Sequence, residues 1–188
     1  MLVRGGGVMR GYHKDPERTA EVLVDGWLHT GDIGHLDADG NLFITDRKKD
    51  LMKTSGGKYV APQKVESVMA ANIPYVSQTL AVGDGRKYIS ALFTLDPVAL
   101  EKWARNHGKE GMPYAELTQL PEVRRSIQRF VDRANKNLER WETVKQFAIL
   151  PGEFTVDDGG VTANMKIRRA AVTQQYADVV ESLYEAEE

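Results

Sequence analysis

Hydrophobic positions along the chain recur with two periods, and these predict an alternation of helices and strands. Helical spacing covers residues 62–73, where Pro62 stands at the first helical position, residues 97–107 after Asp96, and residues 121–138. One continuous final helix is predicted through five further apolar positions: Val172, Tyr176, Val179, Val180 and Leu183.

Strands are predicted between these helices, at residues 76–82, 88–95 and 144–150. Alternation in the second strand is expected to put one set of residues on a single buried face: Ile89, Ala91, Phe93 and Leu95. The polar stretch around Gly111 and Pro113 is interpreted as a connection between helices. Strand pairs interleaved with helices indicate an α+β fold rather than a regular parallel sheet.

The first 46 residues have a different character, with short β-segments separated by glycine-rich turns. Asp15 and Pro16 are expected to open a short helical turn, and residues 34–46 have the pattern of a hairpin. Strands this few and this short need neighbours, so no independent core is expected here. We therefore divide the chain into a β-rich segment, 1–46, and an α+β domain, 47–188.

Composition excludes several classes of protein. The net charge of −2 gives no electrostatic reason to expect nucleic acid or an anionic membrane as partner. The absence of cysteine excludes disulfides and a cysteine nucleophile, and the four histidines lack the spacing of metal ligands. No apolar run is long enough to span a bilayer. A cytoplasmic location is expected, and peripheral contact with the inner membrane face stays open.

Four motifs carry a resemblance to a known family: GWLHTGD (26–32), DRKKD (46–50), SGGKYVAPQKVE (55–66) and TANMKIRR (162–169). Together they resemble the adenylate-forming superfamily of acyl-CoA synthetases, luciferases and peptide-synthetase adenylation domains. They are most similar to long-chain fatty-acid–CoA ligases. The similarity runs from about the first residue to the end, with the motifs in the family order.

The resemblance implies a reaction in two half-steps. A fatty-acid carboxylate attacks the α-phosphate of ATP, which gives acyl-adenylate and releases pyrophosphate. The thiol of coenzyme A then attacks the acyl carbon and releases AMP. Residues 47–188 would be the mobile C-terminal lid, a small mixed sheet with flanking helices, and residues 1–46 the end of the N-terminal domain with its ribose-binding loop. The phosphate loop, the acyl tunnel and the ligands of Mg²⁺ would lie in a missing N-terminal part. We expect a fragment that is inactive by itself.

The resemblance also assigns roles near the junction of the two segments. Asp32 would accept hydrogen bonds from the ribose hydroxyls, and Arg47 would donate to the same ribose. Lys49 would be the hinge on which the lid pivots. From the residues alone, Asp32 is also explained as an Asp that stabilises a turn. Arg47 could equally be a surface residue or a partner of Asp46 or Asp50, and Lys49 one more lysine of a cationic loop.

Two further sites follow from the resemblance. Ser55, Gly56 and Gly57 would line a narrow channel for the pantetheine arm of coenzyme A, with Lys58 near its nucleotide end. Lys166 would be the lysine that catalyses adenylation by holding the carboxylate and the α-phosphate together. Without the resemblance, Lys166 belongs to a basic helix start. Two other residues are interpreted as structural: Glu66, and Trp141 as part of the core.

Two alternatives to a coenzyme A ligase stay open. The chain could be a non-catalytic module that binds a nucleotide or a protein through the cationic segment 47–58. It could also belong to a fatty acyl-AMP ligase that transfers the acyl group to the thiol of a carrier protein. Lys58 and the path along Gly56 and Gly57 favour coenzyme A over a carrier.

Overall fold

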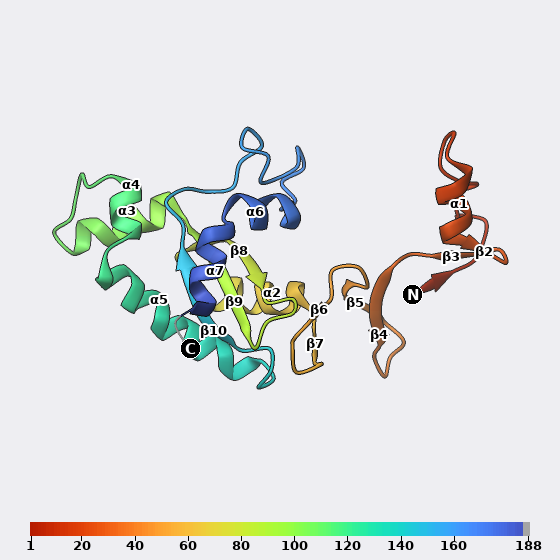
Figure 1. Ribbon diagram of the computed structural model, residues 1–188, viewed down its shortest axis with the longest axis horizontal. Helices are drawn as coiled ribbons and strands as arrows, with labels where there is room; N and C mark the ends of the chain where they lie inside the picture. The colour runs from red at the N-terminus through yellow and green to blue at the C-terminus, as the bar shows by residue number, and fades with distance from the viewer. Residues whose placement is uncertain (186–188) are drawn as a thin grey trace. The chain divides into compact units, whose positions relative to one another are not determined.

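The computed structural model describes residues 1–185. The chain divides after Leu51 into two compact units (Figure 1). The first begins with a three-stranded antiparallel sheet of order β1-β3-β2. Its strands are β1 (Leu2–Val3), β2 (Leu23–Val24) and β3 (Trp27–His29). Asp25 and Gly26 both have positive φ, at 51° and 76°, which is the turn geometry that matches the twist of a tight hairpin.

A short helix and a hairpin complete the first unit. Helix α1 (Pro16–Val22) begins as predicted, because the Asp15 carboxylate accepts the Arg18 N–H at 3.0 Å and Pro16 fits the first turn. The predicted hairpin is formed by β4 (Asp32–Leu36) and β5 (Leu42–Arg47).

The first unit has almost no interior. Among its residues only Asp46 is buried, and the β4–β5 hairpin leaves large apolar side chains in solvent: Leu36, Leu42, Phe43 and Ile44. Strand propensity and turn chemistry therefore form this unit without a core of its own. This confirms the expectation that these short strands cannot build one.

The second unit is organised around a mixed sheet of order β10-β9-β8. Strand β8 (Val76–Val82) is antiparallel to β9 (Ile89–Leu95), and β10 (Val144–Ile149) is parallel to β9. A separate hairpin pairs β6 (Met52–Lys53) with β7 (Tyr59–Val60). The predicted α+β fold class is confirmed.

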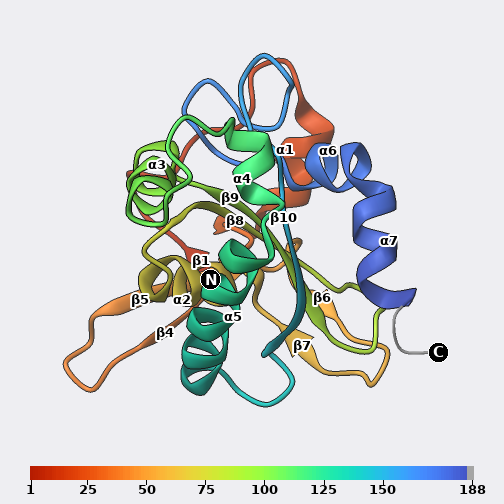
Figure 2. The same cartoon turned by 90° about the vertical axis from the view of Figure 1, so that its left-hand side faces the viewer.

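Helices cover both faces of this sheet, as Figure 2 shows. One face carries four helices: α2 (Pro62–Asn72), α3 (Pro97–Asn106), α4 (Tyr114–Thr118) and α5 (Pro121–Ala134), which continues into the short 3-10 helix η1 (Asn135–Asn137). The other face carries α6 (Arg169–Gln175) and α7 (Ala177–Glu185). All seven residues of β9 are buried. Ile89, Ala91, Phe93 and Leu95 face the first set of helices, as predicted, but Leu92 is packed as fully on the other side.

The prediction of one continuous final helix is wrong. The helix breaks at Tyr176, whose φ and ψ are −109° and 30°, and α7 starts at the next residue. The break lets Val172 of α6 and both Val180 and Leu183 of α7 pack into one core. The connection around Gly111 and Pro113 also differs from its interpretation, because α4 follows Pro113 directly.

Replacing Phe93 with alanine tests the central role of β9. Phe93 is fully buried, with its ring centroid 5.5 Å from that of Phe147. We expect Phe93→Ala to lower the free energy of unfolding by about 3–5 kcal/mol, because a large cavity opens in the core. Val98→Ala, at a side chain that is 75% exposed, should change it by less than about 0.5 kcal/mol. Urea denaturation measures both, and similar losses for the two variants would contradict a central role for β9.

Candidate functional site

Asp32 and Arg47 meet across the β4–β5 hairpin. The strand register places the two residues opposite each other, and Arg47 Nε lies 3.0 Å from Asp32 Oδ1. A β-bulge between Ile33 and Gly34 separates this pair from the regularly paired remainder of the hairpin. Gly34 is required there, because a Cβ at this position would lie 2.4 Å from the carbonyl oxygen of Phe43. The close approach of the two strands therefore depends on this glycine.

The pair leaves polar groups available for a ligand. Asp32 is largely covered, with 17% of its side chain exposed, whereas Arg47 is 63% exposed. The terminal nitrogens of Arg47 have no partner among residues 1–185. The alternative that the side chain of Arg47 pairs with Asp46 or Asp50 is wrong, since this side chain pairs with Asp32 and it is the backbone N–H of Arg47 that donates to Asp46. A carboxylate beside an open guanidinium offers acceptors and donors suited to two adjacent hydroxyls.

Lys49 lies in an exposed turn that follows β5. The turn is closed by two backbone hydrogen bonds, from Lys48 N to Gly31 O at 2.7 Å and from Asp50 N to Arg47 O at 3.0 Å. The first unit ends at Leu51, directly after this turn. Because Lys49 is part of neither a helix nor a strand, its backbone torsions can change without breaking a ladder.

The loop between β6 and β7 is held by Thr54. Thr54 N donates to Lys58 O at 2.9 Å, Gly57 N donates to Thr54 O at 2.8 Å, and Lys58 N donates to Thr54 Oγ1 at 3.1 Å. A fourth bond joins Ser55 N to Arg86 O at 2.8 Å. The backbone of the predicted channel wall is therefore fixed, although Ser55, Gly56, Gly57 and Lys58 are all exposed.

The two glycines of this loop differ in whether their backbone conformation requires glycine. Gly57 has a φ of 79°, which an L side chain adopts only with strain, and Gly56 has no such value. A Cβ would meet nothing within 4 Å at Gly57, and at Gly56 only Thr54 Oγ1 at 3.9 Å. The wall along Gly56 and Gly57 therefore borders open space within the second unit.

Trp141 extends this site, and its interpretation as a core residue is wrong. Its side chain is 41% exposed, and Lys58 Nζ lies 5.0 Å from the ring centroid. The neighbouring Glu142 is buried and pairs with Lys64 of α2, which fixes the segment in place. One signal could have revealed this: Trp141 lies in the polar stretch LERWET, outside any apolar period.

Lys166 lies at the end of a small exposed loop. Val161 and Ile167 form an isolated β-bridge at its base, and Thr162 N donates to Lys166 O at 2.9 Å. Lys166 N donates to Thr162 Oγ1 at 3.1 Å, whereas the ammonium group has no partner among residues 1–185. Helix α6 begins at Arg169 with Arg168 as its N-cap, so the basic segment 166–169 does lead into a helix start, and Lys166 itself lies in the loop before it.

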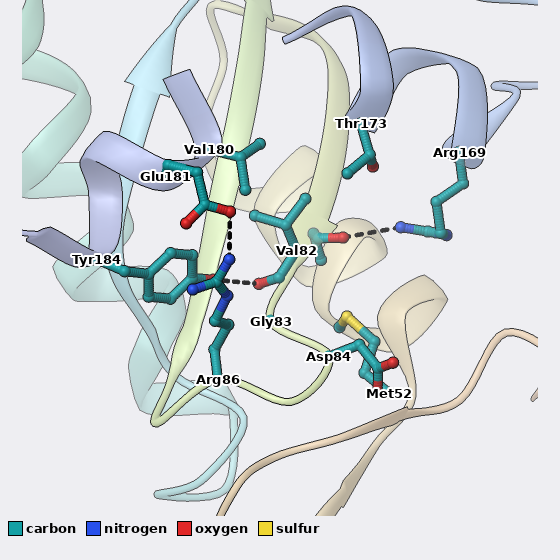
Figure 3. Close-up of a pocket in the computed structure, with 11 residues that line it drawn as sticks. Met52, Val82, Gly83, Asp84, Arg86, Arg169, Thr173, Val180, Glu181 and Tyr184 are labelled. Carbon is teal, nitrogen blue, oxygen red and sulfur yellow. Dashed lines mark hydrogen bonds and ion pairs between the residues drawn. The ribbon is translucent and has the colours of Figure 1, made fainter. Parts of the chain in front are cut away.

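A pocket of about 210 Å³ lies in the second unit, between α6, α7 and the turn after β8 (Figure 3). None of the predicted site residues lines it. Its floor is apolar, and Arg86 pairs with Glu181 on one side. Burial raises the pKa of Tyr184, which keeps its hydroxyl protonated, and this hydroxyl donates to Val82 O at 3.1 Å.

Two kinds of feature are absent from residues 1–185. No helix in that range is both long and apolar enough to cross a bilayer. No three histidine or carboxylate side chains in that range gather closely enough to hold a metal ion.

Known proteins resemble the chain in sequence. The model of a family described as AMP-binding enzyme C-terminal domain matches residues 49–188. The chain is 40% identical over 188 residues to the long-chain-fatty-acid–CoA ligase FadD15 of Mycobacterium tuberculosis, covering 100% of this chain and 31% of the relative. The chain is 38% identical to long-chain-fatty-acid–CoA ligase 1 of Cavia porcellus, and the match covers 98% of this chain and 27% of the relative. The chain thus spans less than a third of the length of these curated relatives.

A solved structure resembles the chain over the same extent. It is the A domain of a carboxylic acid reductase from Segniliparus rugosus, in complex with AMP and a co-purified carboxylic acid. The TM-score is 0.74 at 27% identity, and the match covers 98% of this chain and 27% of that one.

The glycine pair of the β6–β7 loop gives a matched test of the geometry. Gly57→Ala should lower the free energy of unfolding by about 1 kcal/mol, because alanine is strained at positive φ. Gly56→Ala should leave it unchanged within about 0.5 kcal/mol, since its Cβ enters free space. Chemical denaturation of the two variants measures this difference, and an equal effect would show that the loop has another conformation.

Proposed function

The chain belongs to the family of AMP-binding enzyme C-terminal domains, and from this premise we propose that it forms the C-terminal part of an ATP-dependent, AMP-forming long-chain fatty-acid–CoA ligase. Identities of 40% and 38% over nearly the whole chain, to relatives named as such ligases, support the substrate class. In this proposal the fatty-acid site, the phosphate loop and the Mg²⁺ ligands belong to the part that precedes residue 1.

The observation that carries the proposal is the free ammonium of Lys166 on a fixed loop. In adenylate formation, negative charge develops between the fatty-acid carboxylate and the α-phosphate of ATP. A positioned ammonium stabilises that charge and holds the two reactants in line. Lys166 suits this role because its backbone is bonded to Thr162 while its side chain is exposed and unpaired within residues 1–185.

Asp32 and Arg47 hold the ribose in this proposal. The ribose hydroxyls donate to the Asp32 carboxylate and accept from the open nitrogens of Arg47. The ion pair between the two side chains supports the role, since it orients both groups before the nucleotide arrives. AMP retains its ribose after pyrophosphate leaves, so the same contacts serve both half-reactions.

Lys49 is the pivot in this proposal. The turn that contains it follows Arg47, and the family match begins at residue 49. A rotation there changes which loop of the second unit faces the nucleotide. In one pose the loop of Lys166 serves adenylation, and in the other the loop of Gly56 and Gly57 admits the thiol.

Lys58 and Trp141 bind the nucleotide end of coenzyme A. The ammonium neutralises phosphate charge, and the exposed indole offers a flat face to the adenine ring. Exposure of both side chains, together with the 5.0 Å separation of Lys58 Nζ and the ring centroid, supports this assignment. A carrier-protein thiol has no adenine to stack, so Trp141 favours free coenzyme A as the acceptor.

Separate assays of the two half-reactions test the role of Lys166. In the full-length protein, Lys166→Ala should slow acyl-adenylate formation roughly a hundredfold or more, because the developing charge loses its cation. Thioester formation from supplied acyl-adenylate should stay within about twofold of the wild type. Pyrophosphate release and acyl-CoA production measure the two steps. Lys136→Ala, at an exposed lysine of η1, is the control, and equal loss in both steps would contradict the assigned role.

Comparison of coenzyme A with pantetheine tests the role of Trp141. Trp141→Ala should raise the KM for coenzyme A about tenfold, as expected for loss of one stacked base. The KM for pantetheine, which lacks the nucleotide, should stay unchanged. Tyr59→Ala is the control: it removes an exposed aromatic side chain of the same β6–β7 hairpin that contacts Lys53 rather than Lys58, and it should leave both KM values unchanged. A similar rise with both thiols would place the adenine elsewhere, and acyl transfer only to a carrier protein would favour the acyl-AMP ligase.

A further inference from the structure

Arg169 reaches from the first turn of α6 to strand β8 (Figure 3). Its Nη1 donates to the carbonyl oxygen of Ala81 at 2.8 Å, and its Nη2 donates to Glu66 Oε1 at 2.8 Å. The side chain is 30% exposed and that of Glu66 is 17% exposed. Both groups are thus partly withdrawn from water, where charge-assisted hydrogen bonds are stronger than at an open surface.

Glu66, which lies on α2, binds the same residue of β8 as Arg169 does. The same Oε1 atom accepts the backbone N–H of Ala81 at 2.9 Å. Strand β8 is at the edge of its sheet, so its outward backbone groups have no neighbouring strand to pair with. Glu66 and Arg169 therefore supply the two partners that a further strand would have offered, and they join α2, β8 and α6 at one residue.

This junction fixes the loop that carries Lys166. The loop ends just before Arg169, and the neighbouring Arg168 N donates to Gly160 O at 2.8 Å. At the base of the loop, Ile167 packs against the core that contains the buried Val161. The position of Lys166 relative to the sheet is thus set by Arg169 on one side and by this small bridge on the other.

The coenzyme A loop has separate supports. Lys53 N donates to Asp84 Oδ1 at 2.8 Å, Gly85 N donates to Lys53 O at 2.8 Å, and Ser55 is bonded to Arg86 O. None of these bonds involves Arg169 or Glu66. Loss of the Arg169 side chain therefore removes one of the two supports of the Lys166 loop and leaves the backbone around Gly56 and Gly57 in place.

We infer that Arg169 and Glu66 are positioning residues for adenylation, which hold the loop of Lys166 against the edge of β8. The inference rests on the proposed role of Lys166 and adds the residues through which that role is maintained. Neither side chain touches substrate. A displacement of about 1 Å at the reacting atoms costs roughly a hundredfold in rate, so a loosened loop is enough to impair the first half-reaction.

The test compares two neighbouring arginines in the full-length protein. Arg169→Gln should slow acyl-adenylate formation by about ten- to a hundredfold and leave thioester formation from supplied acyl-adenylate within about twofold. Arg168→Gln removes the same charge one position earlier, from an exposed side chain whose Nη1 donates to Gly159 O at 3.3 Å. It should leave both steps within about twofold of the wild type.

Conservative variants separate positioning from folding. Arg169→Lys keeps a charged donor but not the fixed fork, and it should recover part of the lost adenylation rate. Glu66→Gln keeps an acceptor for the N–H of Ala81 and loses the charge, so a smaller loss confined to adenylation is expected. Loss of both half-reactions in these two variants, or no loss in Arg169→Gln, would overturn the inference.

Amide hydrogen exchange of the same full-length variants gives a readout that does not depend on activity. The backbone amides of residues 166 and 168, both bonded within this loop, should exchange faster in Arg169→Gln than in Arg168→Gln. If the wild-type protein forms no acyl-adenylate, the proposed function fails. The exchange difference still tests whether Arg169 holds the Lys166 loop in place. Unchanged exchange would overturn the positioning whatever the activity.

Discussion

Burial of β9 on both faces is the constraint on which the second unit depends. Ile89, Phe93 and Leu95 face the helices α2 to α5, while Leu92 faces α6 and α7. Since a strand with two buried faces needs cover on each side, the chain must return to the sheet after β10 and lay down its last two helices. The loop of Lys166 is part of the segment that makes this return, and the bridge between Val161 and Ile167 closes its base.

Most of the fold could be predicted from period and turn chemistry. The first and last residues of β8 are those predicted. Asp15 and Asp96 cap the helices that follow them, and Pro62 occupies the first position of its helix, as the sequence indicates. The break at Tyr176 could not be predicted, because apolar residues continue at helical spacing through it. Packing decides that break: only two separate helices bring Val172 and Val180 into the same core.

The candidate site was predictable in its residues and much less so in their contacts. Motifs pointed to Asp32 and Arg47 separately, and their ion pair follows from a strand register with a bulge that no motif encodes. Trp141 was missed because large aromatic residues are usually buried. Arg169 and Glu66 lie far apart in sequence, and only the three-dimensional fold shows that both serve the backbone of Ala81.

The lack of an interior in residues 1–51 bears on how the protein can be handled. Neither core of the second unit includes a residue before Met52. A truncated version that starts at Met52 would lack the exposed apolar side chains of Leu36, Phe43 and Ile44. It would retain all the residues of both cores. Exposed apolar strands promote association between molecules. The shorter chain is accordingly the better starting point for solution spectroscopy at high concentration.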